Sequence, residues 1–396
     1  QLRAEGHDPA TSPQLLDIVD HLDHDDPTSD ERTPFAELHL TAARTARRAL
    51  AFDRAAHYVE RALSLLPADP WPTHRDLAFA LHDLAAEIAF HTGDRTTRER
   101  SEQEVLRRAQ TPLETVGVRL LSIRDDLAAM RWDQGTDTAI ATLKSLGVHL
   151  ARQPTKAHVA WELVRTQQAL GRRGAAELGS AEATDDPTHL AVDELLLWCA
   201  TSGYFAAPDL VPLCGLRMTR LAAQRGVGAH TAFGLALMGL VQAGVLERTE
   251  EALAWADAAD QLMQRFDSHA LAGKVGLLAD GFTRGWARPQ RDRIPKLLDR
   301  RMAALDVGDE TFAVYCGAAA FYSTWPSGWT LPSIARRFEP VVEHAATSRQ
   351  RQAWPMFASW GQLHRCLADG EHQDGRLVGD LWDWELEKPR LLEERD

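Results

Sequence analysis

Residues 36–69 read AELHLTAARTARRALAFDRAAHYVERALSLLPAD. Apolar residues recur every three or four positions in this stretch, which is the spacing of one face of an α-helix. Ala55 and Ala62 lie seven residues apart, so they line one stripe of the helix where a neighbouring helix can approach closely. Pro67 cannot continue a helix and ends this one. The stretch therefore predicts a helical hairpin.

Weaker copies of this pattern follow along the chain, and strand signals are scarce. The spacing of the copies is roughly 35–45 residues, which is typical of helical-hairpin solenoids. The second helix of the first hairpin has the pattern of a tetratricopeptide-like repeat. The fold class that we predict is all-α, a tetratricopeptide-like α-α superhelix of about eight or nine hairpins. Further helices are expected near 73–91, 95–109, 113–131, 136–146, 250–266, 269–286, 290–305, 309–323, 331–347 and 349–368.

Three regions are expected. The helical array spans 35–370. Residues 1–34 are expected to form a helix and an acidic loop that lead from a missing upstream module, because the chain begins with Gln1. Residues 371–396 are expected to be a polar tail with a short helix near Trp382. Within the array, residues 204–212 are predicted to be a loop that carries two prolines.

Composition excludes several classes of function. The formal net charge is −13, which disfavours nucleic acid and anionic membranes as direct partners. There is no long apolar run and no signal peptide, so the expected location is the cytoplasm. The absence of asparagine, with five lysines beside 39 arginines, suggests a GC-rich bacterial genome. Four cysteines in apolar stretches are expected to be buried free thiols: Cys199, Cys214, Cys316 and Cys366.

Catalytic motifs are missing from the sequence. We find no GxxxxGK[ST], no GxSxG and no HExxH, so no enzyme activity, cofactor or metal is expected. The acidic run at 17–31 is one possible exception, because an aspartate-rich patch in an all-α protein is similar to the magnesium site of terpene cyclases. A second metal-binding helix is lacking, and we interpret the run as a solvated helix end with Asp30 or Thr33 capping the next helix. The run contains Asp17, Asp20, His21, Asp23, His24, Asp25, Asp26, Asp30 and Glu31.

Aromatic residues give the best candidates for a binding site. The stretch at 322–329 is predicted to be a loop whose tryptophans, beside proline and glycine, present rigid aromatic surface. The alternative is a turn whose rings cover the core. Tryptophans at helical spacing, namely Trp161, Trp198, Trp255 and Trp286, are interpreted as core residues. The candidate residues for a partner or ligand are Trp286, Arg288, Phe321, Tyr322, Trp325 and Trp329.

Arginine pairs and glycines are given structural interpretations. The pairs recur near expected helix C-termini, where they complement the helix dipole: 47–48, 107–108, 172–173, 300–301 and 336–337. Five glycines are expected at positions where helices pack closely: Gly203, Gly215, Gly234, Gly239 and Gly244.

Short stretches in a fixed order give the sequence a family resemblance over about residues 15–345. They are 16–22, 55–67, 108–113, 146–150, 186–187, 204–205, 208–210, 225–226, 285–289 and 308–309. In this order they resemble the helical region of large bacterial signalling proteins. There a STAND-type ATPase module, often preceded by a Ser/Thr kinase domain, is followed by this superhelix and then by sensor, histidine-kinase or DNA-binding modules. The resemblance implies a regulatory arm that senses a partner and is coupled to an ATPase outside this chain.

Three hypotheses about function follow. The first is a non-catalytic recognition arm of a multidomain ATP-dependent signalling or transcriptional regulator, which binds a protein, a peptide or an effector on its concave surface. The second is a helical receptor for a small molecule, with a pocket near 282–329. The third is an all-α metal-dependent enzyme that uses the acidic run at 17–31.

Overall fold

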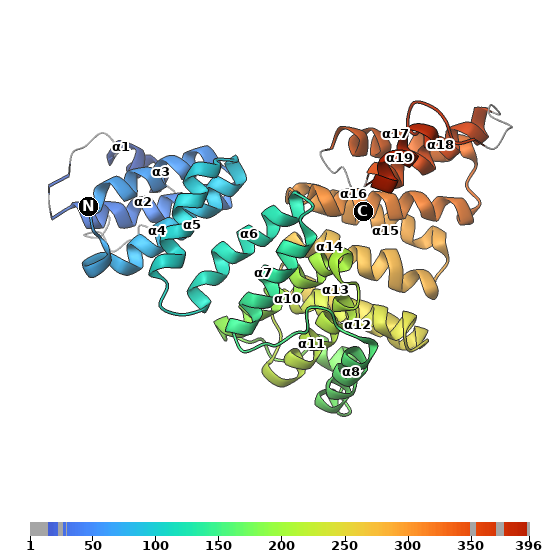
Figure 1. The fold of residues 1–396 in the computed structure, drawn as a ribbon, viewed down its shortest axis with the longest axis horizontal. Helices are drawn as coiled ribbons and strands as arrows, with labels where there is room; N and C mark the ends of the chain where they lie inside the picture. Colours follow the sequence, from blue (N-terminus) through green and yellow to red (C-terminus); the bar gives the residue numbers. More distant parts are fainter. Residues whose placement is uncertain (1–14, 23–26, 29, 349–353, 370–375, 394–396) are drawn as a thin grey trace. The chain divides into compact units, whose positions relative to one another are not determined.

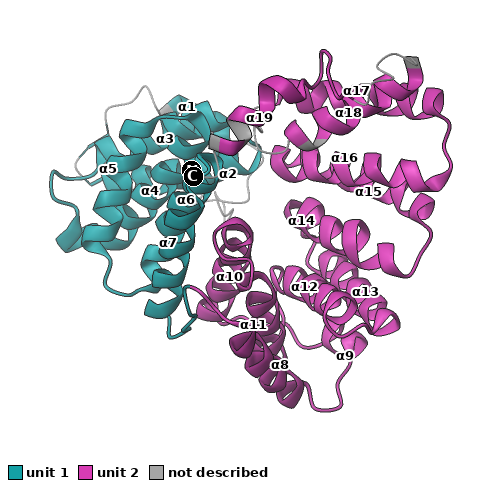
Figure 2. Cartoon of the chain, turned by 45° about the vertical axis from the view of Figure 1, so that its right-hand side comes forward, with its two compact units in different colours: residues 1–152 teal, residues 153–396 magenta. Residues whose placement is uncertain are grey.

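The computed structural model describes residues 15–22, 27–28, 30–348, 354–369 and 376–393. In these residues every named element is a helix, and the only β-type pairing is an isolated bridge between Ala183 and Val227. The all-α prediction is confirmed. The chain divides into two compact units, residues 1–152 and 153–396 (Figure 2), so the single array expected at 35–370 is shared between them.

The first unit is built from antiparallel helix pairs (Figure 1). Helix α2 pairs with α3, α4 with α5 and α6 with α7, and α4 also packs against α3 and α6. Ala55, Tyr58 and Ala62 are fully buried, which confirms the small-residue stripe. The helices are α1 (Leu15–Leu22), α2 (Arg32–Arg48), α3 (Phe52–Leu65), α4 (Trp71–Thr92), α5 (Arg95–Arg108), α6 (Val116–Ala128) and α7 (Trp132–Ser145).

Two of these hairpins turn in the same way. Leu50 follows α2 and Met130 follows α6, and both have a φ of 58°, in the left-handed region that residues other than glycine rarely adopt. In each turn the next amide reaches back five residues: Ala51 N–H donates to the Ala46 carbonyl at 2.9 Å, and Arg131 N–H donates to the Asp126 carbonyl at 2.7 Å. The same local geometry therefore recurs in two hairpins of one unit.

The second unit continues with helices that mostly pack on their neighbours in the chain. Two exceptions are α8, which packs on α11, and α9, which packs on α13. The helices are α8 (Lys156–Leu170), α9 (Ala175–Gly179), α10 (Pro187–Ala206), α11 (Leu210–Arg225), α12 (Thr231–Gly244), α13 (Thr249–Arg265), α14 (Ala272–Gly276), α15 (Gln290–Asp306), α16 (Glu310–Thr324), α17 (Leu331–Thr347), α18 (Trp354–Asp369) and α19 (Trp384–Glu393).

Close packing of α11 on α12 depends on glycine. A Cβ added to Gly215 would lie 2.5 Å from the Leu237 Cβ, and one added to Gly234 would lie 2.5 Å from the Met218 Cβ. Gly203 and Gly239 are similarly crowded, so the close-packing prediction is confirmed for these four glycines. It is wrong for Gly244, where a Cβ would meet nothing within 4 Å.

Several local predictions are wrong in instructive ways. The loop expected at 204–212 is mostly helix, because α10 continues to Ala206 and α11 starts at Leu210. Pro212 lies in the first turn of α11, where a missing N–H costs nothing. The loop expected at 322–329 is shortened because α16 continues to Thr324 and a 3₁₀ turn covers residues 325–327. Trp161 is 65% exposed and not in the core, whereas the prediction is confirmed for the buried Trp255.

Candidate functional site

The helix expected at 269–286 is broken into several types of helix. After α14, residues Leu277–Phe282 form a π-helix (η4), and Thr283–Trp286 form a 3₁₀ turn (η5). π-helical turns are rare and occur frequently at functional sites, because they cost backbone energy that the surrounding structure must offset. Side-chain contacts from three neighbouring helices hold this segment in place.

Five charged side chains from α13, η4, η5 and α15 form an ionic cluster around one buried carboxylate, and we call it the Asp280 cluster. At its centre Asp280 is completely buried and accepts hydrogen bonds from Arg284 Nη1 at 2.7 Å and from Arg300 Nε at 3.1 Å. Arg284 Nη2 also donates to Asp257 Oδ1 at 2.6 Å and to Asp260 Oδ2 at 2.8 Å, and Arg300 donates to Asp260. The cluster therefore joins three segments of the chain around one carboxylate.

The electrostatics of the cluster favour the charged forms of its arginines. Burial alone would lower the pKa of Arg284, but the hydrogen bond that Arg284 donates to Asp257 and the charges of Asp280 and Asp260 more than offset this effect and raise that pKa. The pKa of Arg300 is raised in the same way, against burial, by Asp260 and Asp280. Three carboxylates and two guanidiniums leave one excess negative charge. The cluster thus satisfies its own hydrogen bonds and fixes η4 against α13 and α15.

A third arginine, Arg293, holds the π-helix through its backbone. Arg293 donates through Nη1 to the Gly281 carbonyl at 2.6 Å and through Nε to Ser323 Oγ at 2.9 Å. Burial lowers the pKa of this guanidinium. Gly285 leaves the room that the Arg293 guanidinium occupies, since a Cβ there would clash with it. The distorted segment is therefore tied to both α15 and α16.

The segment 277–286, which these arginines hold in place, exposes two large apolar side chains to solvent. Phe282 is 46% exposed and Trp286 is 68% exposed, and they lie four residues apart. We call this pair the Trp286 platform. The interpretation of Trp286 as a core residue is wrong, because its side chain is mostly exposed at the end of η5. Arg288, two residues further on, is also exposed.

The structure places the other predicted aromatic residues around α16, α17 and α18. Phe321 is buried in the core, with its ring 5.4 Å from that of Phe338. Tyr322 and Trp325 are half-buried, and their rings lie 5.0 Å and 5.6 Å from the ring of Trp360. These three residues thus pack mainly against the protein itself.

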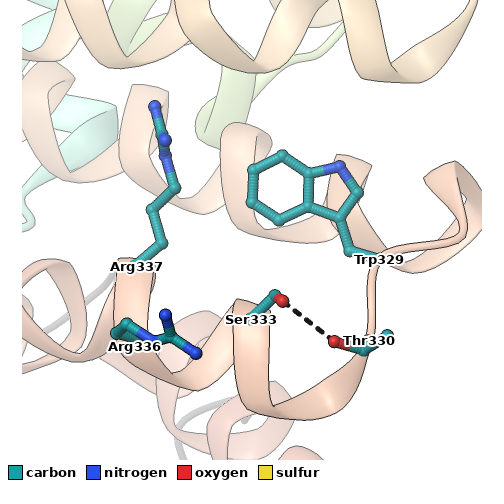
Figure 3. A pocket seen from close by; sticks show the side chains of 5 residues that line it. All are labelled: Trp329, Thr330, Ser333, Arg336 and Arg337. Atoms are coloured by element: carbon teal, nitrogen blue, oxygen red, sulfur yellow. Dashed lines mark hydrogen bonds between the residues drawn. The ribbon is translucent and has the colours of Figure 1, made fainter.

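Trp329, the last of the predicted residues, lines an open hollow of about 610 Å³ (Figure 3). The other lining residues are Thr330, Ser333, Arg336 and Arg337, and we call the five together the Trp329 hollow. Arg337 holds its guanidinium carbon 5.7 Å from the centre of the Trp329 ring. At the foot of the hollow the Thr330 and Ser333 hydroxyls are hydrogen-bonded at 2.9 Å.

The acidic run at 17–31 is used structurally where it is described. Asp20 accepts hydrogen bonds from the Tyr58 hydroxyl at 2.5 Å and from Arg54, and so joins α1 to α3. Glu31, and not Asp30 or Thr33, occupies the N-cap position before α2; its carboxylate accepts hydrogen bonds from the Thr28 amide and hydroxyl and does not cap the helix. Asp23, His24, Asp25 and Asp26 lie outside the described residues. In the described part of the chain, no three His, Cys, Asp or Glu side chains are close enough to hold a metal ion.

The cysteines differ in their accessibility. Cys199, Cys214 and Cys316 are buried, whereas Cys366 is partly exposed. A hydrogen bond with Cys199, together with burial, raises the pKa of the Cys214 thiol, and burial raises the pKa of Cys316 to about 12. Thiolates, not thiols, react with maleimides.

We therefore expect one cysteine of the native protein, Cys366, to react quickly with a maleimide, and the other three to react only after unfolding. Intact-mass spectrometry of the labelled protein gives the count. The Cys366→Ser variant is the control and should stay unlabelled until denaturant is added. Rapid labelling of that variant would contradict the burial of the remaining thiols.

Comparison with known proteins leaves the site to be interpreted from its own geometry. No protein-family model matches the sequence, and searches of curated proteins and of solved structures gave no significant match. Across the described ranges, no helix has both the length and the apolar character needed to cross a bilayer.

Proposed function

We propose that this chain is a non-catalytic recognition module that binds a protein partner, and that the Trp286 platform is part of the binding surface. The observation that carries the proposal is the exposure of Trp286 on a segment that the Asp280 cluster holds rigid. Tryptophan is enriched among the residues that dominate interface energetics. A binding residue on a preorganised backbone segment gains affinity, because little conformational entropy is lost on binding.

The arrangement of helices supports a tetratricopeptide-like superhelix as the architecture of the module. Successive antiparallel pairs are the structural unit of such arrays, and the shared turn at Leu50 and Met130 is the kind of repetition that they show. Stacked hairpins form long concave surfaces that suit peptides and partner domains. In this proposal the chain is a regulatory arm of a multidomain ATP-dependent signalling or transcriptional regulator.

The alternative is a receptor for a small molecule. The Trp329 hollow supplies the aromatic, cationic and hydroxyl groups that such a site uses, but it is open to solvent, whereas small-molecule sites enclose most of their ligand. Of the residues expected around the pocket near 282–329, the hollow contains Trp329 and not Trp286, Phe321, Tyr322 or Trp325. A metabolite retained by the purified protein in native mass spectrometry, and lost in Trp329→Ala, would support this alternative.

Photo-crosslinking tests the recognition proposal. A benzophenone side chain is placed at position 282 or 286 and irradiated in cells that express the protein. We expect both positions to give a crosslinked product with one discrete protein. Position 245 is the matched control, because Val245 is also exposed but lies outside the platform. Equal crosslinking from all three positions, or none from the platform, would refute the proposal.

A further inference from the structure

Two arginines of the Trp329 hollow are not explained by the helix that carries them. Arg336 and Arg337 lie in the first half of α17, which runs from Leu331 to Thr347. The sequence interpretation, that they complement the dipole at a helix C-terminus, is wrong for this pair, although it holds for the pairs at the ends of α2 and α5. Both side chains are exposed, and within the described residues neither forms an ion pair.

Both arginines line a site with mixed chemistry, and in Figure 3 the Arg337 guanidinium lies level with the Trp329 indole while that of Arg336 lies lower, near Ser333. In Figure 3 the Arg337 guanidinium and the Trp329 indole stand on opposite sides of the hollow, with Ser333 and Thr330 below them. A guanidinium beside an aromatic ring keeps its edge N–H groups free to bind a carboxylate. One of the two hydroxyls donates to the other, so a second O–H remains available as a donor.

The charge of the hollow contrasts with that of the whole chain. Its five lining residues include two cations and no carboxylate, whereas the chain has a net charge of −13. A local positive site on an acidic protein attracts a small number of negative charges. A nucleic acid is a poor occupant, because two arginines displace few counterions and the remaining surface repels a polyanion.

We propose that the Trp329 hollow binds an acidic segment of a protein partner. Its carboxylates would pair with Arg336 and Arg337, and an apolar side chain beside them would lie on the Trp329 indole. Arg–carboxylate pairs of this kind are often bidentate and give orientation as well as affinity. The inference rests on the proposed recognition function but uses residues outside the Trp286 platform.

Fluorescence anisotropy of the full chain tests this proposal. The probe is a short fluorescein-labelled peptide of Glu, Asp and Leu, and its neutral partner has Gln and Asn in place of the acids. We expect the acidic probe to bind and the neutral one not to bind, with an affinity that falls as salt is added. The double variant Arg336→Gln/Arg337→Gln should bind the acidic probe roughly tenfold more weakly or worse, since hydrogen bonds to charged groups are lost.

Matched variants separate the hollow from general charge effects. Arg165→Gln/Arg172→Gln removes the same charge from two other exposed arginines and should keep wild-type affinity. Arg336→Lys/Arg337→Lys keeps the charge but not the bidentate geometry, so it should bind with intermediate affinity; circular dichroism checks the fold of each variant. Binding that is equal for both probes, or absent in the wild type, would overturn the proposal.

Two competitors distinguish other occupants. Inorganic phosphate that displaces the probe completely at low concentration would show a site for a free anion, and a single-stranded RNA that binds more tightly than the peptide, through the same arginines, would show a nucleic-acid site. Either result overturns the proposal. Crosslinking at position 286 would be unaffected by these outcomes, so failure here is separable from failure of the recognition function.

Discussion

Asp280→Asn is expected to lower the stability of the second unit by about 3 kcal/mol, because removing one partner of a buried ion pair leaves uncompensated charge. The amide is nearly isosteric with the carboxylate, so packing is preserved. Its NH₂ group, however, would face Arg284 or Arg300, which are both donors. The loss corresponds to a fall in Tm of roughly 6–12 °C for a unit of this size.

The control for this experiment is Asp257→Asn. The Asp257 side chain is 73% exposed, although it also pairs with Arg284, and exposed pairs contribute about 1 kcal/mol or less. Thermal unfolding of both variants gives the comparison, and hydrogen exchange over residues 277–286 localises the change. Equal small effects in the two variants would show that the π-helix does not depend on the buried carboxylate.

Glu162→Gln is expected to release α8 from α11. Glu162 is buried, and it accepts hydrogen bonds from Arg217 at 2.8 Å and 3.0 Å and from Arg220 at 2.6 Å. The face of α8 that packs on α11 has few other buried side chains, so this polar contact is a large part of its attachment. We expect a loss of about 3–5 kcal/mol, seen as faster hydrogen exchange over residues 156–170. Glu251→Gln, which alters an exposed pair with Arg248, should leave exchange unchanged.

The same carboxylate makes the attachment of α8 sensitive to acid. Burial would raise the pKa of Glu162, but Arg217 and Arg220 more than offset it and hold the pKa below its ordinary value of 4.5. A carboxyl group with a lowered pKa contributes stability above its unfolded value and loses it as the pH falls through the folded one. Exchange over 156–170 should therefore rise below about pH 4.5 in the wild type. The Gln variant should show no such transition, and a transition of equal size there would assign the acid response to another group.

Hydrophobic periodicity predicted the helix ranges of the first unit and most of those after residue 250, but it gave no ranges for α8 to α12. Ala55 and Ala62 sit on a regular stripe, so their burial could be inferred from spacing alone. The π-helix at 277–282 could not be predicted from spacing, because a π-helix depends on tertiary contacts and not on the spacing of apolar residues. The charged residues of the cluster occur in two pairs, Asp257 with Asp260 and Asp280 with Arg284, spaced three and four residues apart. In a sequence, charges at such spacing are typical of a solvated helix face. Arg300 reaches these pairs only in the folded chain, where α15 packs on η4 and α13 packs on η5.

The structure places the candidate binding residues in different surroundings, and their role in binding stays a prediction. Trp329 lines a hollow and Trp286 is exposed, whereas Phe321 belongs to the core. A helix was expected at 331–347, where α17 lies, so the interpretation of the arginines at 336 and 337 as helix C-terminal residues did not follow from that range. Pro332 marks the start of α17 in the structure. A proline in the first turn was the signal that places both arginines within the helix and not at its end.

The π-helix has a consequence for how this region tolerates changes in chain length. One extra residue per turn is what separates a π-turn from an α-turn, and each residue of an α-helix advances the chain by about 100° around the axis. Losing a single residue between 277 and 282 would replace the wide turn by an ordinary one and would change the angles of the neighbouring residues around the helix axis, that of the indole at 286 among them. Homologues that differ here by one residue would then display a different surface on an otherwise unchanged scaffold.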